Sequence, residues 1–304
     1  MWLAVRPDWA GVLLVLFVPG VFFPPGTTTG GVAVIRRLAV VTLLMLLLTA
    51  CGQAPPAPKP APAPPAGSAP ADPAHGIRLE AGRFDGQAGI FAKNLGDGRS
   101  VEVNADKIFP TASTHKLVVA LAVYRYLYPD AAPAQRRAYD RAIKAMMVTS
   151  DNPSFYRLLD EIAARKPDAL TRVLVDLRLT HTRIHSGEAF RRYGYHSVTT
   201  PREMAAVFEA IYNEAYLGKE MSAILKEELA NTIYREEIPR FMQRSRVMHK
   251  VGSLPGLLCD VGIVDDGRDK ILISVFAATR RPETYASNFI AHASATAYNA
   301  LRTK

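Results

Sequence analysis

A serine and a lysine three positions apart stand at the start of an apolar stretch. The segment 109–116 reads Phe-Pro-Thr-Ala-Ser-Thr-His-Lys and holds Ser113 and Lys116. On a helix, residues i and i+3 share a face, so the Ser113 hydroxyl and the Lys116 amine can touch. A serine needs an adjacent base to become a nucleophile, and a lysine whose pKa is lowered by burial can be that base. The unpaired N–H groups of a helix start suit a developing oxyanion, so the segment predicts an active-site serine.

The rest of the chain predicts how this segment is positioned. The ranges 88–94 and 100–104 flank Leu-Gly-Asp-Gly and are typical of a β-hairpin. Three strand-like runs come near the other end of the chain, at 246–251, 259–265 and 270–278. Between the two sets we expect helices at 113–127, 134–147, 153–164 and 168–177, an irregular segment at 179–198, and helices from 200 and over 222–233; a last helix covers 282–301.

This order predicts an α+β fold. Strands at both chain ends, with helices between them, indicate one five-stranded antiparallel sheet that is flanked by helices and completed by both ends. The central helices form an inserted lobe. This architecture brings residue 113 near residue 250 across a cleft.

The first 75 residues differ from the rest in composition. Cys51 closes a Leu-Thr-Ala-Cys sequence, after Arg36-Arg37 and an apolar run, which is the pattern of a secretory signal. The ending resembles a bacterial lipobox, which implies that Cys51 becomes the lipid-modified first residue; an incidental cysteine in a plain signal peptide is the alternative. Residues 53–74 are almost all proline and alanine, which favours a semi-rigid spacer.

We therefore expect a leader at 1–50, a lipidated Cys51 with its linker at 51–75, and a globular domain at 76–304. A second apolar run at 11–23 precedes the signal. We interpret the residues before about 32 as lying ahead of an internal start, with an extra membrane-associated segment as the alternative. The expected location is the cell envelope, outside the inner membrane and anchored to a membrane through Cys51.

Two more motifs follow the serine–lysine pair in order. The sequence reads Ser-Asp-Asn at 150–152 and His-Lys-Val-Gly-Ser at 249–253, where a strand ends. Ser-x-x-Lys, Ser-Asp-Asn and Lys-Thr-Gly in this order are the signature of class A β-lactamases and penicillin-binding proteins. Residues 76–304 thus resemble a class A β-lactamase-type serine hydrolase.

The resemblance implies how the reacting groups divide the work. Ser113 would attack the β-lactam carbonyl and form an acyl-enzyme, with proton transfer assisted by Lys116. The backbone N–H groups of Ser113 and Ser253 would form the oxyanion hole. Ser150 would pass a proton to the leaving nitrogen.

The other motif residues would bind and orient the substrate. Asn152 would hold its amide side chain, and Lys250 would orient Ser150 and attract a substrate carboxylate. Gly252 would let the ligand backbone lie against the strand. Val251 replaces a threonine that normally contacts the substrate carboxylate, and valine cannot hydrogen-bond.

Two further positions depart from the family pattern. An arginine is often found on the facing strand, where this chain has Asp-Val-Gly at 260–262. Ser253 or Arg235 could compensate for it. The segment 182–188 resembles the start of the loop that carries the deacylating glutamate, which places Glu188 at that position. The asparagine expected after it is absent, so Glu188 is either the deacylation base or an exposed loop carboxylate.

Three functions stay open. The first is a serine β-lactamase-type hydrolase. The second is an enzyme that acts on cell-wall D-alanyl peptides or binds penicillin, and deacylates slowly; the third is a non-catalytic envelope binding protein. We expect a monomer with a small-molecule β-lactam or peptidoglycan-peptide substrate and no cofactor. The net charge is +9, but the sequence has no basic run, zinc-finger spacing or alternation of aromatic and basic residues that would indicate nucleic-acid binding.

Histidines and the second cysteine suggest no further chemistry. His181, His185 and His196 lack acidic or cysteine partners at ligand spacing, so we expect no metal. Cys259 lies in a strand-like run without an evident base, which is typical of a small buried residue.

Overall fold

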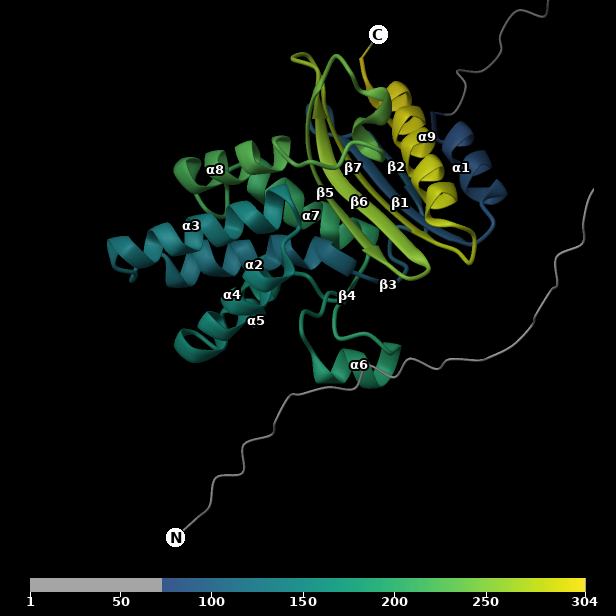
Figure 1. Cartoon of the computed structure of the whole chain (residues 1–304). Coiled ribbons are helices and arrows are strands. Elements are labelled where there is room, and N and C mark those ends of the chain that lie inside the picture. Colours follow the sequence, from purple (N-terminus) through teal and green to yellow (C-terminus); the bar gives the residue numbers. More distant parts are fainter. Residues whose placement is uncertain (1–72, 304) are drawn as a thin grey trace, which may run out of the picture. The chain divides into compact units, whose positions relative to one another are not determined.

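The computed structural model describes residues 73–303, and one antiparallel sheet organises them. Its strand order is β2-β1-β7-β6-β5, so the hairpin from the N-terminal side pairs with strands from the C-terminal side (Figure 1). The register joins Ile90 of β1 to Val275 of β7. The strands are β1 (Gln87–Asn94), β2 (Ser100–Val103), β5 (Arg246–Leu254), β6 (Leu257–Asp265) and β7 (Lys270–Ala278).

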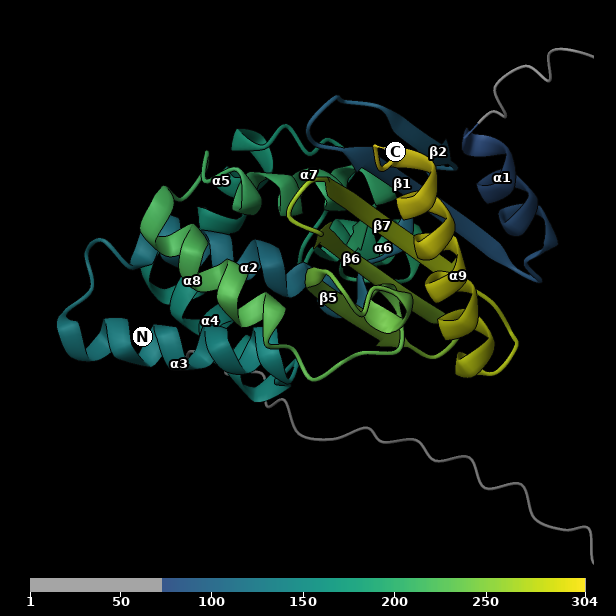
Figure 2. The ribbon, with the colours of Figure 1, turned by 90° about the horizontal axis from the view of Figure 1, so that it is seen from above.

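Helices cover both faces of this sheet. Helices α1 (Pro73–Arg83) and α9 (Glu283–Leu301) lie on one face, and α7 (Pro201–Tyr212) lies on the other, beside the helical lobe (Figure 2). Short strands β3 (Phe109–Pro110) and β4 (Val198–Thr199) pair where the chain enters and leaves the lobe. The lobe holds α2 (Lys116–Ala122), α3 (Pro133–Val148), α4 (Asn152–Arg165), α5 (Ala169–Asp176), α6 (Gly187–Tyr193) and, after α7, α8 (Lys219–Ala230).

Strand periodicity explains the two buried faces. Successive side chains of a strand point to opposite faces, and in β7 Ile273 and Val275 pack on the α9 side while Leu272 and Phe276 pack on the lobe side. All four are fully buried. Helix α2 is buried all round, which makes it the centre of the lobe.

The structure confirms the predicted α+β class with a five-stranded antiparallel sheet. The predicted strands are found with shifts of a few residues, and β5 extends to Leu254. The predicted helix over 113–127 is instead three pieces: a 3-10 turn η1 (Ala112–His115), α2, and a π-helical turn η2 (Val123–Leu127). The helix expected from 222 begins at Lys219 and ends at Ala230.

Helix α6 corrects the expectation of an irregular segment at 179–198. The Ser186 hydroxyl accepts a hydrogen bond from Ala189 N at 3.2 Å and caps the helix, and Gly194 ends it with φ 76°. Seven residues are too few to show a helical period in the sequence.

The predictions for the leader, for Cys51 and for most of the linker lie outside the described residues. Helix α1 begins at Pro73, slightly before the predicted domain start at 76. None of the helices between residues 73 and 303 has the length and apolarity needed to cross a membrane.

Candidate active site

The predicted nucleophile lies in a strained turn. Ser113 belongs to the 3-10 turn η1, and the residue before it, Ala112, has φ 44°, in the left-handed region that a residue with a Cβ rarely adopts. The turn is held from behind, because the Thr114 hydroxyl donates to the Thr111 carbonyl at 2.6 Å. Strain of this kind persists where the surrounding structure imposes it, and it is frequent at functional sites.

Lys116 begins α2 directly after this turn, and each N–H group of its ammonium has a hydrogen-bond acceptor. Its side chain is buried, and Nζ donates to Ser150 O at 2.5 Å, Ser150 Oγ at 3.2 Å and Asn152 Oδ1 at 2.6 Å. An ammonium group has three N–H donors, so these acceptors satisfy it. Within the described residues, no hydrogen bond joins Lys116 to Ser113, although the two lie three positions apart.

Ser150 lies just before the start of helix α4. Asp151 caps α4, because its Oδ2 accepts from Ser154 N at 2.7 Å, and Pro153 occupies the first turn. Ser150 itself has φ 57°, a second left-handed residue. This turn directs both its carbonyl and its hydroxyl oxygen at Lys116.

Lys250 reaches the same hydroxyl from the sheet. It lies in β5 with no exposed surface, and its Nζ donates to Ser150 Oγ at 2.9 Å and Val251 O at 2.8 Å. Ser150 Oγ therefore accepts hydrogen bonds from two lysines, which occupy both of its lone pairs. Its own proton remains free to be donated elsewhere. The structure thus brings together Lys116, Ser150, Asn152 and Lys250, which we call the lysine cluster.

Burial changes the proton affinity of both lysines. The pKa of Lys116 is lowered to about 8 by burial, against an opposing effect of the Asp151 carboxylate. The pKa of Lys250 is lowered to about 7 by burial and by the neighbouring charge of Lys116. Each lysine can therefore lose its proton near neutral pH, which an ordinary lysine cannot do.

Gly252 brings the edge of the sheet against the nucleophile turn. A Cβ at this position would lie 2.8 Å from Ser113 N and 2.9 Å from both Ala112 Cβ and Cys259 Sγ. Strand β5 is the edge strand of the sheet, so some of its N–H groups have no strand partner. The next residue, Ser253, is exposed there. The N–H of Ser113 and the backbone of 252–253 therefore lie side by side.

The Gly252→Ala variant tests how closely these two backbones must approach. We expect the rate of active-site acylation to fall by about 10²–10³-fold, because the strand must move away from Ser113 N. The same overpacking is expected to destabilise the fold by about 1–3 kcal/mol. Stopped-flow acylation by a chromogenic cephalosporin and thermal unfolding measure the two effects.

Gly82→Ala is the matched control, since a Cβ on this helical glycine of α1 would have no neighbour within 4 Å. It is expected to leave acylation unchanged. An unchanged acylation rate in Gly252→Ala would contradict the close approach.

A buried histidine and a tyrosine support Lys250, and the sequence did not indicate them. His249 Nδ1 lies 2.9 Å from Asp260 Oδ2, and Nε2 lies 3.1 Å from the carbonyl oxygen of Tyr234. Both histidine nitrogens face oxygen acceptors, which fixes the ring. The Tyr234 ring in turn lies 5.8 Å from Lys250 Nζ, and its hydroxyl donates to Thr149 O at 3.3 Å.

The two compensating residues suggested by the sequence do not join the lysine cluster. The Arg235 guanidinium donates to Ala230 O at 3.4 Å, and the side chain lines a separate pocket with Pro239. The Ser253 hydroxyl donates to Glu283 Oε2 at 2.6 Å. Asp260, in the segment 260–262 where the family often has an arginine, is buried against His249.

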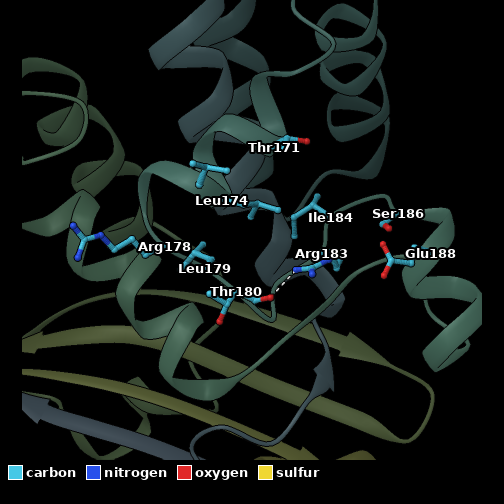
Figure 3. Close-up of a pocket in the computed structure, with 10 residues that line it drawn as sticks. Thr171, Leu174, Arg178, Leu179, Thr180, Arg183, Ile184, Ser186 and Glu188 are labelled. Carbon is cyan, nitrogen blue, oxygen red and sulfur yellow. Dashed lines mark hydrogen bonds between the residues drawn. The ribbon is translucent and has the colours of Figure 1, made fainter.

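Glu188 is also apart from the lysine cluster. It lies in the first turn of α6, exposed, and lines a pocket of about 710 Å³ together with Leu174, Arg183 and Ile184 (Figure 3). In the described part of the chain it forms no hydrogen bond or ion pair with Lys116 or Ser150. The missing asparagine after Glu188 was the one sequence signal of this difference.

His181, His196 and Cys259 occupy structural positions. His181 contacts Glu203, which holds the loop at 180–182, and the His196 ring stacks on Phe190 at 4.4 Å. Cys259 is a fully buried free thiol behind Gly252, and burial raises its pKa. Between residues 73 and 303, no group of three His, Cys, Asp or Glu residues could hold a metal ion.

A serine in a strained turn, a buried lysine pair and a second serine between the lysines define a serine acyl-transfer site. Residues 76–301 match the model of the beta-lactamase enzyme family, and the chain belongs to this family. The protein is a serine hydrolase of the β-lactamase type.

Solved structures with the same fold are distant in sequence. PBP-A is 20% identical, with a TM-score of 0.65, and the match covers 76% of this chain and 96% of that one. TLA-1 extended-spectrum β-lactamase is 17% identical, with a TM-score of 0.65 and coverage of 75% and 97%. A β-lactamase from Sphaerobacter thermophilus DSM 20745 is 20% identical, with a TM-score of 0.63 and coverage of 75% and 96%. Curated protein sequences gave no match.

Proposed function

We propose that Ser113 is the residue acylated by β-lactams, and that Lys116 and Ser150 carry its proton to the leaving nitrogen. The observation that supports this most directly is the Ser150 hydroxyl, which accepts hydrogen bonds from Lys116 and Lys250 and keeps its own proton free. A group in this state is a proton donor, which the departing nitrogen of an amide requires.

The proton balance closes within these residues. Neutral Lys116 accepts the Ser113 proton as Oγ bonds to the lactam carbonyl carbon. The resulting oxyanion is stabilised by backbone N–H groups of Ser113 and Ser253. The C–N bond then breaks while Ser150 gives its proton to the nitrogen, and the Lys116 ammonium, 3.2 Å away, gives a proton back to Ser150. Lys116 ends neutral, and Ser113 carries the acyl group.

Substrate binding in this proposal uses the flanking residues. Asn152 is exposed at the start of α4 and holds the amide side chain of the substrate. Lys250 orients Ser150, and Gly252 leaves room for the ligand against β5.

Deacylation separates the proposed β-lactam hydrolysis from a second candidate function. Glu188 is the residue assigned to activate water, yet within residues 73–303 it forms no hydrogen bond or ion pair with the lysine cluster and lines a pocket that contains none of its members. This observation favours an enzyme that is acylated readily and released slowly, acting on D-alanyl peptides of the cell wall or binding penicillin. Among the similar folds, a PBP-A variant is an acyl-enzyme complex with penicillin G.

One experiment tests acylation and release together. The full chain is mixed with a fluorescent penicillin and with a chromogenic cephalosporin, and covalent labelling and turnover are followed in parallel. Peptide mapping of the adduct should place it on Ser113. Rapid turnover supports β-lactam hydrolysis, and a stable label without turnover supports the second candidate. An adduct on another residue, or none, contradicts the proposal.

The Glu188→Gln variant tests the assigned deacylation base. Because Glu188 is exposed and apart from the lysine cluster, we expect the deacylation rate to change far less than the roughly 100-fold that loss of a general base costs. Pulse-chase release of the fluorescent penicillin measures this rate. Accumulation of acyl-enzyme in the variant, but not in the parent, would restore Glu188 as the base.

The proposal extends to location and assembly. Anchoring at a membrane of the cell envelope through lipid-modified Cys51 is supported by the Leu-Thr-Ala-Cys sequence and the proline- and alanine-rich segment that follows it. In this proposal the protein acts as a monomer. Its partners in this proposal are a small-molecule substrate and the membrane, without nucleic acid.

A further inference from the structure

A histidine of the loop before α6 is joined to the nucleophile turn through one residue. His185 N donates to Ser197 Oγ at 3.0 Å, and the Ser197 carbonyl accepts from Thr111 N at 3.1 Å. Thr111 is the residue directly before η1 and lies two positions before Ser113. Two hydrogen bonds therefore connect the backbone of His185 to the turn that carries the nucleophile.

The charge of His185 also acts on a residue inside the site. His115 ends η1 directly before Lys116, and its ring packs on Phe155 with the centroids 4.4 Å apart, while Lys116 Nζ lies 5.9 Å from the same ring. The pKa of His115 is lowered to about 3, first by burial and then by three nearby charges. These charges are those of Lys116, Lys250 and His185. Because the interaction of two charges falls with distance and is screened by salt, His185 lies close to His115.

The imidazole of His185 has no partner that would occupy its nitrogens. The side chain is exposed, and among residues 73–303 its ring forms no hydrogen bond or ion pair; it contacts the His196 ring, at 6.1 Å between the centroids. The backbone is held at φ 50°, in the left-handed region. The loop therefore imposes the position of this ring and leaves its nitrogens open to water.

Glu188 belongs to the same loop but lines a different space. Ile184, Ser186 and Glu188 line the pocket of Figure 3, and His185 is not one of its lining residues. The glutamate thus faces a pocket without any member of the lysine cluster, whereas the histidine is joined to the turn of Ser113. A loop histidine that only packs on a neighbouring ring is the simpler interpretation, but such packing does not require an imidazole with both nitrogens unpaired.

We infer that His185 activates the water that releases the acyl group from Ser113. The inference rests on the proposed acylation of Ser113. The neutral imidazole accepts a proton from water while the water oxygen bonds to the acyl carbon. The bond between this carbon and Ser113 Oγ then breaks with its electron pair on Oγ, and the imidazolium returns the proton to Oγ. The acid leaves, and serine and histidine end in their initial states.

Release of a fluorescent penicillin from Ser113 tests this assignment. The full chain is labelled, excess reagent is removed, and loss of the label is followed over hours for the parent and for His185→Gln, which keeps a polar side chain without a base. We expect release to be about 10²-fold slower in the variant and the acylation rate to change by less than about twofold. His292→Gln is the matched control, because it makes the same change at an exposed position on α9, on the other face of the sheet. It should release like the parent.

Restoring a base separates catalysis by His185 from a structural role in the loop. The His185→Gly variant suits a φ of 50° and leaves space for imidazole, so imidazole added to the solution should accelerate release in proportion to its concentration. His185→Glu should release faster than His185→Gln, since a carboxylate is also a base. Imidazole should not accelerate release from His292→Gln.

The possible results distinguish this inference from the proposed function. Release that is unchanged in His185→Gln, or that slows and is restored neither by imidazole nor by the carboxylate, overturns the inference while Ser113 stays acylated. A parent protein whose label on Ser113 is never released overturns it as well. Absence of any label on Ser113 overturns the proposed function and this inference with it.

Discussion

The Ser113→Ala variant is expected to lose covalent labelling by a fluorescent penicillin altogether, and to turn over a chromogenic cephalosporin at least about 10⁴-fold more slowly. The alanine removes the oxygen that would bond to the carbonyl carbon. The hydroxyl of the lysine cluster cannot replace it, because Ser150 Oγ already accepts hydrogen bonds from Lys116 and Lys250. Gel fluorescence and intact-mass measurement of the protein check the result.

The fold is expected to be insensitive to this change. In the described residues, the Ser113 hydroxyl makes no hydrogen bond, so its loss should shift the unfolding midpoint by no more than about 2 °C. Ser100→Ala is the matched control, because Ser100 begins β2 at the sheet edge opposite to β5. It should label like the parent. A label that persists in Ser113→Ala would show that another nucleophile, such as Ser253, is acylated.

Local sequence patterns predicted most of the fold. The turn between the first two strands, and the apolar runs of β6 and β7, are visible in the sequence because each depends on residues a few positions apart. The split of 113–127 into a 3-10 turn, an α-helix and a π-helical turn was not visible, because the three differ in the spacing of their backbone hydrogen bonds and the sequence shows one continuous apolar run. Helix α6 was missed because its cap at Ser186 and its end at Gly194 enclose only seven residues.

The candidate site, like the fold, was predicted only in part from the sequence. Three ordered motifs predicted that residues near 113, 150 and 250 meet, and Lys116, Ser150 and Lys250 do meet in the structure. The contacts that distinguish this chain are non-local. Ser253 and Glu283 are 30 positions apart in the sequence, and the turn after β7 brings them together. No local sequence pattern predicts their hydrogen bond. Glu188 had a loose sequence match, but its position depends on the conformation of a whole loop.

The two lysines illustrate a conflict between stability and function. Taking an ammonium group out of water costs free energy, and the cost appears as a lowered pKa. Lys250 has no exposed surface, and Lys116 has almost none. The hydrogen bonds to Ser150 and Asn152 recover part of this cost. The chain thus keeps two charges that a hydrophobic residue could replace, and the low pKa is what allows Lys116 to act as a base.

The Lys116→Met variant separates the two effects, since methionine fills a similar volume without a charge. Acylation is expected to fall by about 10³–10⁴-fold, because Ser113 loses its base. In the parent, acylation should rise with pH through about 8, the pKa of Lys116, as the amine loses its proton. This rise should be absent from the residual activity of the variant. Stopped-flow acylation from pH 6 to 10 measures both.

The Lys116→Met variant is expected to gain stability although it loses activity. The pKa of Lys116 is about 8 in the folded chain and about 10.5 in the unfolded chain, so between these values the unfolded state binds more protons and stability rises with pH. Below pH 8 the full cost of the buried charge is present. The variant is therefore expected to be more stable than the parent by roughly 1–3 kcal/mol at pH 6, with the difference shrinking toward pH 10. Denaturant unfolding at both pH values measures this. A variant that is less stable at pH 6, or that keeps the pH-dependent rise in acylation, would contradict the role of Lys116 as a buried base.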